Sequence, residues 1–357
     1  MQAAVLWAGG EPITIAEIDE PALDAHDVRI EVQASGVCHS DITTSRLPTP
    51  KPAIMGHEGA GVVVELGREV SRVAVGDRVI ASYVPSCGNC FYCVRGEATQ
   101  CVRSADLINS HRGTVNGQPV LAKGGLGTWS QRMTVSELQV VPVKTDLPSE
   151  QLALIGCGVT TGAGAALWSA KVQPGSTVAV YGCGGVGMFT IQGARIAGAA
   201  RIFVVDPLES KRNAAVKVGA TDLIDPADGD PVEQIKALTE GRGTDYAFEV
   251  VGRPDTIMQT YNTVRPRGTA VVVGMPQPDA AITLPVGTMF RFERRFMGSF
   301  CGSAQAQRDM PILVQLAESG KLDIGAAVSQ YVKLEQAPDA LAALDAGEVF
   351  RSVILPN

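Results

Sequence analysis

The pattern of hydrophobic and polar positions changes near residue 150, and before that point it predicts strands and turns. Residues 28–34 alternate between apolar and polar side chains, as a half-buried strand does. Residues 61–66 and 77–81 are short β-branched runs bounded by glycine. Long helical periodicity is scarce over these residues, so we expect a first domain rich in β-structure.

After residue 150 the pattern predicts strands that alternate with helices. The predicted strands are residues 176–181, 201–206, 223–225, 246–251 and 269–273. The predicted helices among them are residues 188–197, 211–218 and 231–239. Such alternation is typical of a parallel, doubly wound sheet, so we expect an α/β fold. From about residue 301 the pattern predicts two helices and a last strand near residues 353–355.

Length and charge exclude several function classes. A chain of 357 residues is long enough for two domains. Its 30 basic and 37 acidic residues give a formal net charge of -7, which provides no basic footprint for nucleic acid. No run approaches the ~20 apolar residues that a membrane helix needs, and residues 1–10 do not resemble a secretory signal. We therefore expect a cytoplasmic protein that binds neither nucleic acid nor membrane.

Half of the eight cysteines lie close together in the sequence. They are Cys87, Cys90, Cys93 and Cys101, in a C-x2-C-x2-C-x7-C pattern. Four such thiolates can complete a tetrahedral shell around one Zn²⁺, which leaves no open position for chemistry. The alternative is a disulfide cluster, but consecutive C-x2-C pairs are awkward to bridge, and clustered cysteines in a cytosolic chain more often bind metal. We expect a structural zinc in a turn-rich lobe of about residues 85–127.

A glycine motif follows the first strand predicted beyond residue 150. Gly182, Gly184 and Gly187 form G-x-G-x-x-G between a strand and a helix, and Asp206 closes the next strand. This context predicts a dinucleotide site, with the pyrophosphate at the helix N-terminus and Asp206 on the adenosine ribose. A 2′-phosphate would meet the charge of Asp206, which favours NAD over NADP. Lys211 is equally explained as a ribose partner or as a solvated lysine.

A second set of metal-binding residue types is spread along the sequence. Cys38 and His57 lie in the β-rich part, and Cys157 lies just before the nucleotide domain. Two thiolates and one imidazole leave the fourth position of a zinc open, which is the catalytic arrangement. Each residue taken alone has a simpler interpretation as a core residue.

The motifs together resemble those of a zinc-dependent alcohol dehydrogenase of the medium-chain dehydrogenase/reductase superfamily, of the bacterial, long-segment type. Residues 56–70 match the zinc signature of that family, G-H-E-G-A-G-V-V-V-E-L-G-R-E-V. The other motifs occur in the family's order: G-V-C-H-S-D, the four-cysteine lobe, G-C-G-V-T-T-G, G-C-G-G-V-G and F-R-S-V. The resemblance covers essentially the whole chain.

The resemblance implies a GroES-like catalytic domain and a Rossmann domain. The catalytic domain would contain residues 1–157 and 301–357, with the zinc lobe at about 85–127, and the NAD-binding Rossmann domain would contain residues 158–300. The long segment between Cys101 and Cys157 favours a homodimer through the nucleotide-domain sheets, with a tetramer as the alternative.

The resemblance also implies a role for each candidate residue. The catalytic zinc would be held by Cys38, His57 and Cys157, and the structural zinc by Cys87, Cys90, Cys93 and Cys101. Asp41 would orient His57, Glu58 would lie beside the metal, and Ser40 would take the proton of the alcohol. Cofactor-binding residues would be His39, Thr161, Gly182, Gly184, Gly185, Val186, Gly187, Asp206, Lys211, Val251, Val273 and Arg351, with His39 and Arg351 on the pyrophosphate.

The implied reaction is the reversible oxidation of an alcohol, in which zinc acts as a Lewis acid and hydride passes to NAD. Many family members end a proton relay in a histidine where this chain has Thr43, so we expect the proton to pass through Thr43 or a water. Tyr83 and Trp129 occupy pocket-wall positions of the family, which would favour primary alcohols; core packing is the alternative for both.

Two alternatives within the superfamily remain open at this stage. The first is a formaldehyde dehydrogenase that oxidises a thiol adduct, for which His111, Arg112 or Lys123 would hold the thiol's carboxylate. The second is a dehydrogenase that keeps its NAD tightly bound and recycles it with an artificial acceptor.

Overall fold

The computed structural model describes residues 1–48 and 52–357, and these residues form two compact units. Unit 1 consists of Met1–Gly158, Gln305–Ser319 and Ile324–Asn357. Unit 2 consists of Val159–Ala304 and Gly320–Asp323.

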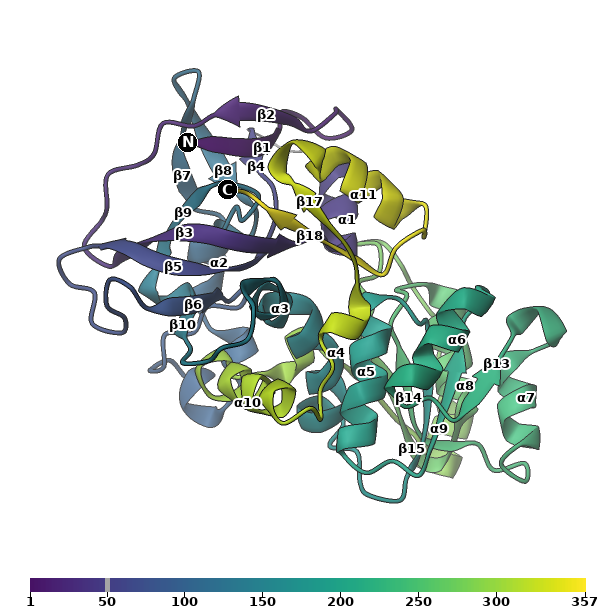
Figure 1. Ribbon diagram of the computed structural model, residues 1–357. Coiled ribbons are helices and arrows are strands. Elements are labelled where there is room, and N and C mark those ends of the chain that lie inside the picture. Colours follow the sequence, from purple (N-terminus) through teal and green to yellow (C-terminus); the bar gives the residue numbers. More distant parts are fainter. Residues whose placement is uncertain (49–51) are drawn as a thin grey trace. The chain divides into compact units, whose positions relative to one another are not determined.

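Unit 1 contains two sheets in which most neighbouring strands are antiparallel. The first has the order β2 (Thr14–Glu17), β1 (Gln2–Leu6), β4 (Ala53–Ile54), β8 (Gln118–Ala122) and β7 (His111–Val115). The second has the order β10 (Val140–Pro142), β6 (Arg78–Ala81), β5 (Glu58–Leu66), β3 (Asp27–Gly36), β18 (Arg351–Leu355) and β17 (Val328–Lys333), and β9 (Arg132–Ser136) also pairs with β3. This is the β-rich, GroES-like domain that the sequence predicts (Figure 1).

The alternation along β3 explains how the second sheet forms. Val28, Ile30 and Val32 are fully buried in one apolar cluster, whereas Glu31 and Gln33 on the opposite face are exposed. Full burial of a valine or isoleucine side chain contributes about 1.5–3 kcal/mol. The alternating pattern therefore fixes which face of the strand turns inward.

The helices of unit 1 are α1 (His39–Arg46), α2 (Ser104–Ile108), α3 (Ser149–Leu154), α10 (Ala306–Glu318) and α11 (Ala337–Asp345). α1 was not predicted, because seven of its eight residues are polar and only Asp41 and Ile42 are buried. It follows β3 after two residues, so it projects from the end of a strand that belongs to the core.

Unit 2 is built on a six-stranded sheet in which all neighbouring strands are parallel. Its order is β13 (Asp222–Ile224), β12 (Arg201–Val205), β11 (Thr177–Tyr181), β14 (Thr244–Glu249), β15 (Val264–Val272) and β16 (Arg295–Gly298). Its helices are α4 (Thr160–Gly164), α5 (Gly185–Ile196), α6 (Glu209–Val218), α7 (Pro231–Ala237), α8 (Pro254–Thr263) and α9 (Val286–Phe292).

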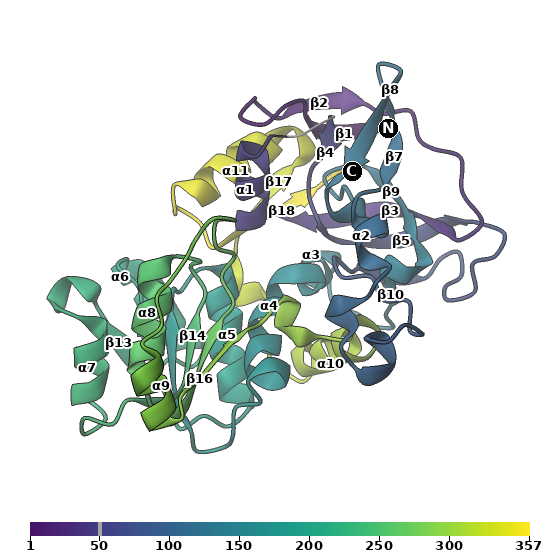
Figure 2. The same cartoon turned by 180° about the vertical axis from the view of Figure 1, so that it is seen from behind.

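Helices cover both faces of this parallel sheet. α5 and α6 lie on the face turned to the viewer in Figure 1, and α8 and α9 lie on the face seen from behind in Figure 2. The predicted doubly wound, Rossmann-like sheet is thereby confirmed. The strand β16 and the helices α8 and α9 have no counterpart in the sequence-based expectation.

One helical segment is long and apolar enough to cross a membrane. It runs from Ser149 to Ser169 over 21 residues, and within the described residues no other helix meets this test. Its most apolar window is 72% buried inside the protein, which is also how a core helix behaves. Polar residues interrupt this segment, so the sequence contains no unbroken apolar run there.

Candidate active site and metal centres

Cys38 is placed by the transition from β3 to α1. It immediately precedes α1, and its backbone N–H donates to Asp41 Oδ2 at 2.9 Å. Asp41 therefore caps the first turn of the helix and at the same time turns its carboxylate toward the site. The bend between β3 and α1 therefore fixes the positions of both the Cys38 and the Asp41 side chains.

His57 is placed by the glycine before it and by a buried tryptophan. Gly56 has φ +86°, and a Cβ there would lie 2.2 Å from Cδ1 of Trp129. Trp129 is fully buried in an apolar cluster with residues such as Leu6 and Met55, and its indole N–H donates to Gly36 O at 3.3 Å. Trp129 therefore packs in the core and supports the Gly56–His57 turn, and its position in the pocket wall stays a prediction.

Cys157 lies in a π-helical turn, Ile155–Val159, between α3 and α4. Such turns are rare and occur often at functional sites. Both flanking glycines are required by close contacts: a Cβ on Gly156 would lie 2.6 Å from Ala81 O, and one on Gly158 would lie 2.4 Å from Arg351 Nη2. The G-C-G motif thus allows the thiol to approach β6 and β18.

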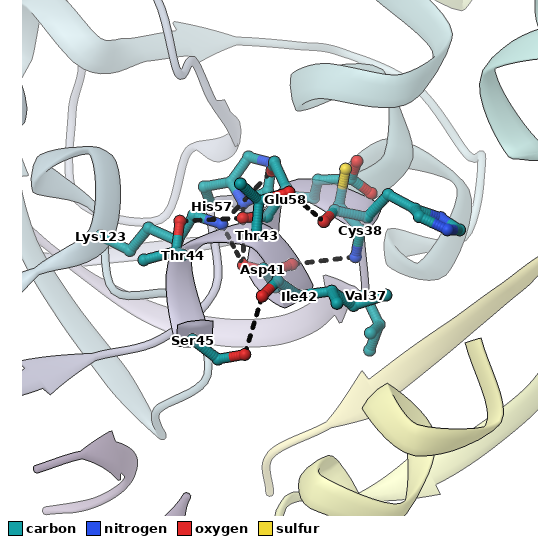
Figure 3. Close-up of polar contacts among 12 residues, drawn as sticks. Val37, Cys38, Asp41, Ile42, Thr43, Thr44, Ser45, His57, Glu58 and Lys123 are labelled. Atoms are coloured by element: carbon teal, nitrogen blue, oxygen red, sulfur yellow. Dashed lines mark hydrogen bonds and ion pairs between the residues drawn. The ribbon is translucent and has the colours of Figure 1, made fainter. Parts of the chain in front are cut away.

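The three candidate zinc ligands and Glu58 converge in unit 1. The donor atoms of Cys38, His57, Glu58 and Cys157 all lie within 4.8 Å of one another. His57 Nδ1 lies 3.2 Å from Asp41 Oδ1 (Figure 3), so an N–H on Nδ1 leaves the lone pair of Nε2 for a metal. Two thiols and one imidazole in this arrangement fit a zinc ion with an open fourth position.

The electrostatics favour the metal-binding form of Cys38. The thiol of Cys157 and the charge of Arg351 lower the pKa of Cys38 well below its ordinary value, although burial opposes this. For His57, burial lowers the pKa, but the Asp41 carboxylate outweighs burial and raises the pKa to about 9. For Asp41, burial raises the pKa, and Lys123 and His57 together lower it overall.

Glu58 and Arg351 form a buried ion pair beside this set. Arg351 Nη1 donates to Glu58 Oε1 at 2.9 Å and to Val37 O at 3.1 Å, and Arg351 is only 3% exposed. Burial raises the pKa of Glu58 to about 7 against the opposing charge of Arg351. Glu58 Oε2 has no hydrogen-bond partner among the described residues, so the carboxylate retains an oxygen for a metal or a ligand. Sequence reasoning missed this pair, and the pyrophosphate role of Arg351 stays a prediction.

Lys123 is a further charged residue at the site that the sequence did not assign to it. Its Nζ lies 2.7 Å from Asp41 Oδ1 (Figure 3). The same atom lies 3.3 Å from Ser40 Oγ. Ser40 Oγ in turn lies 3.1 Å from His57 Nε2. The only sign of this position in the sequence is the pair of glycines that follows Lys123, Gly124 and Gly125. Both adopt positive φ in the structure.

Two of the basic residues considered for a thiol carboxylate are already paired inside unit 1. Arg112 is 8% exposed and donates to Gly125 O at 3.3 Å and to Asp27 Oδ1 at 3.5 Å. The side chain of Lys123 is 6% exposed and is paired with Asp41. The side chain of His111 lies outside the described part of the structure. Neither Arg112 nor Lys123 is a surface cation.

The four clustered cysteines also converge. Their sulfur atoms lie within 4.8 Å of one another, and Sγ of Cys87 is 3.9 Å from Sγ of Cys93. A tetrahedral zinc with bonds of about 2.3 Å spaces its sulfurs by ~3.8 Å, whereas a disulfide needs about 2.05 Å. All eight cysteines are free thiols. The arrangement therefore fits a closed zinc site and not a disulfide cluster.

The glycine motif lies within unit 2 at the carboxyl end of β11. Gly182 has φ +101°, and a Cβ on Gly187 would lie 2.1 Å from Gly182 O. A Cβ on Gly184 would meet no atom within 4 Å, so the backbone there is open to a ligand. α5 has no side-chain cap at its N-terminus, which leaves its amide groups free for an anion.

Asp206 is buried beside this turn. Its Oδ2 accepts from the Cys183 N–H at 2.8 Å and its Oδ1 from the Leu208 N–H at 2.9 Å. Each oxygen keeps a lone pair for a ribose hydroxyl. Arg212 donates to the backbone oxygen of Asp206 at 2.6 Å and is paired with Asp225 at 2.5 Å.

The remaining candidates lie on these elements. The ring of Tyr83 is half-buried and lies edge-on to His57, with 5.2 Å between ring centroids. Thr43 on α1 donates to His39 O at 3.4 Å. His39 and Val251 are exposed, and Thr161, Gly185, Val186, Lys211 and Val273 are half-buried.

Comparison with known proteins agrees with this geometry. Residues 24–145 match the alcohol dehydrogenase GroES-like domain, and residues 185–319 match the zinc-binding dehydrogenase family. An NDMA-dependent alcohol dehydrogenase from Amycolatopsis methanolica is 35% identical over 99% of this chain and 98% of its own length. The chain belongs to the zinc-binding alcohol dehydrogenase family.

Solved structures of this family have the same fold over the whole chain. An alcohol dehydrogenase zinc-binding domain protein from Burkholderia ambifaria has a TM-score of 0.95 and 33% identity, and benzyl alcohol dehydrogenase from Acinetobacter calcoaceticus has a TM-score of 0.94 and 29% identity. In both cases 100% of this chain and 99% of the other chain are covered. The predicted family, enzyme class and fold are thereby confirmed.

Proposed function

We propose that this zinc alcohol dehydrogenase oxidises primary alcohols to aldehydes reversibly, with NAD as hydride acceptor and two zinc ions per chain. The observation that carries the proposal is the convergence of Cys38, His57 and Cys157, whose donor atoms lie within 4.8 Å, with the Ser40 hydroxyl beside them. Three protein ligands leave room for the substrate oxygen.

Cys38, His57 and Cys157 would hold the catalytic zinc, which when bound acts as a Lewis acid on the alcohol or carbonyl oxygen. The protein supplies orientation and the path of the proton. Asp41 holds His57 through Nδ1. Ser40 Oγ lies close enough to His57 Nε2 to reach a substrate oxygen bound beside that nitrogen. Ser40 would take the proton of the alcohol. Cys87, Cys90, Cys93 and Cys101 would hold the second, structural zinc.

The nucleotide site favours NAD. The open backbone at Gly184 and the uncapped N-terminus of α5 fit a pyrophosphate. The buried carboxylate of Asp206 would accept hydrogen bonds from the ribose and repel a 2′-phosphate. Arg212 is paired with Asp225 and is not available to neutralise one.

A primary alcohol is the substrate class that fits Tyr83. Its ring stands edge-on to His57, so it would limit the space for a substrate beside the ligand set. The structural likeness to a benzyl alcohol dehydrogenase supports aromatic or medium-length primary alcohols over bulky secondary ones.

A substrate panel tests this proposal. Benzyl alcohol, hexanol and a branched secondary alcohol would be assayed with NAD and with NADP, and with and without a thiol such as glutathione. We expect NADH formation with the first two alcohols, at least about tenfold less with NADP, and no need for the thiol. A preference for the secondary alcohol, or an absolute need for the thiol, would contradict the proposed substrate class.

The second candidate is a dehydrogenase that retains its NAD, which the similarity to an NDMA-dependent relative favours. The same panel separates the two functions. One outcome would favour this alternative over oxidation with free NAD. In that outcome one NAD per chain is retained through gel filtration, and turnover occurs only when an artificial acceptor such as NDMA is added.

We also propose a homodimer formed through the parallel sheet of unit 2. β16 is the last strand of that sheet in the described structure, so one of its edges has no neighbouring strand there. Such an edge is a ready surface for strand pairing with a second copy.

A further inference from the structure

Lys123 stands out among the charged groups that the proposed reaction leaves without a role. Its side chain is 6% exposed, and its ammonium group contacts two neighbours of the ligand set, Asp41 Oδ1 at 2.7 Å and Ser40 Oγ at 3.3 Å. A buried lysine is rarely tolerated unless it is paired. Asp41 is fully buried and supplies the countercharge.

The hydrogen-bond chemistry of lysine decides the direction of the contact with Ser40. A lysine ammonium group carries three donors and no acceptor, so Ser40 Oγ must accept from it. The one hydroxyl proton of Ser40 is then directed elsewhere. In this structure its other neighbour is His57 Nε2, at 3.1 Å. Once that lone pair is used by a metal, the second lone pair of Ser40 Oγ can accept the proton of the alcohol, and the proton of Ser40 can pass to water.

Thr43 does not provide an alternative base on α1. Its hydroxyl donates back to His39 O at 3.4 Å within the helix, and threonine does not titrate near neutral pH. Ser40 is thus the α1 hydroxyl that lies beside His57 Nε2, and Lys123 donates to it.

We propose that Lys123 is a positioning residue that fixes and polarises the Ser40 hydroxyl. Ser40 then gives its own proton to a water as it accepts the proton of the alcohol, and afterwards donates a strengthened hydrogen bond to the substrate oxygen. This inference rests on the proposed alcohol oxidation. Lys123 acts as a fixed charge and carries no proton away. Its salt bridge to Asp41 holds it in place, and a hydrogen bond that involves a charged group is about twice as strong as a neutral one.

Other charged and titratable groups surround the pair from each neighbouring element. They are Cys38 before α1, Asp41 on α1, His57 before β5, Glu58 on β5, Cys157 before α4 and Arg351 on β18. Of these, Asp41 and His57 interact with the charge of Lys123. A test must therefore distinguish the loss of the Lys123 charge from a general rearrangement of these neighbouring groups.

Lys123→Met keeps the length of the side chain and removes the charge, and Lys144→Met, at an exposed lysine of the same unit, is the matched control. For the best primary alcohol we expect Lys123→Met to lower kcat roughly 10- to 100-fold at pH 7, with the loss shrinking toward pH 10, where loss of the alcohol's proton no longer limits the rate. KM for NAD should not change. Lys123→Arg should recover part of the rate.

Two measurements without turnover complete the test. Lys123→Met should retain the zinc content of the wild type, and in the presence of NAD it should bind trifluoroethanol, an acidic alcohol, about tenfold more weakly than Lys144→Met does. A loss of kcat that is equal at every pH, or zinc loss that accounts for it, would show a structural role and overturn the inference. Unchanged kcat and unchanged trifluoroethanol binding would overturn it as well. If the wild type oxidises no alcohol, the proposed function fails first, so the two failures are distinguishable.

Discussion

At the residue scale, two glycines of one motif have different physical reasons to be glycine. Gly187 has an internal reason, because a Cβ there would lie 2.1 Å from the backbone oxygen of Gly182. Gly184 has an external one. Its φ of -71° suits any residue, and a Cβ there would meet no protein atom within 4 Å. We therefore propose that glycine at this position serves a ligand and not the fold.

This contrast predicts opposite effects for two alanine substitutions. Gly184→Ala should leave the free energy of unfolding within about 0.5 kcal/mol of the wild type and raise the dissociation constant of NAD at least about tenfold. Gly187→Ala should lower the free energy of unfolding by about 1–3 kcal/mol through overpacking. Chemical denaturation and NAD titration by fluorescence measure both. Equal NAD affinity in Gly184→Ala and the wild type would place the pyrophosphate elsewhere.

Residue types with a distinctive spacing could be predicted from the sequence. Cys38, His57 and Cys157 are far apart along the chain, yet each lies in a motif whose letters are specific, and the structure brings the three together. The contacts of Lys123 could not be predicted in this way, and the sequence left the choice between pocket wall and core open for Trp129. A lysine carries no signal of its partner, and whether a tryptophan faces a pocket or a core depends on tertiary packing.

At the element scale, the proposed homodimer would form through the free edge of strand β16. Its four residues pair with β15 on one side, and the sheet ends there among the described residues. Nearby, Val286 and Phe290 on α9 are 73% and 87% exposed, which is unusual for large apolar side chains. Both features suit a surface that a second copy covers.

The edge predicts a dimer whose interface protects β16. Light scattering should give twice the 37.4 kDa of one chain, and hydrogen exchange of the amides in residues 295–298 should speed up when dilution separates the subunits. A monomer at micromolar concentration, or a dimer in which these amides exchange as freely as in the separated chain, would contradict pairing through this edge.

Elements with a clear period were predicted better than those without one. β3 alternates strictly and is found where the pattern places it, and the repeated strands of the parallel sheet are likewise found. α1 is polar over most of its length and was not foreseen, because its position depends on contacts that form only after the sheets are in place. α8 was missed although Ile257 and Tyr261, four residues apart, are both buried on one side of the helix.

At the scale of the whole molecule, the two proposed zinc ions would have different tasks. The cluster of Cys87, Cys90, Cys93 and Cys101 is complete with four thiols and has no place for a substrate. The set of Cys38, His57 and Cys157 is incomplete and lies beside Ser40. One zinc would therefore stabilise the lobe of residues 85–127, and the other would support the reaction.

Zinc content measured together with activity in two single variants tests this division most directly. The wild type should contain two zinc ions per chain by elemental analysis. Cys90→Ser should contain one, unfold at a lower temperature and still oxidise the alcohol when assayed in the cold, because only the lobe loses its metal. Cys157→Ser should also contain one but should have no activity, with little change in unfolding temperature. A Cys90→Ser variant that is fully stable yet inactive, or a wild type that oxidises alcohol without zinc, would contradict the account.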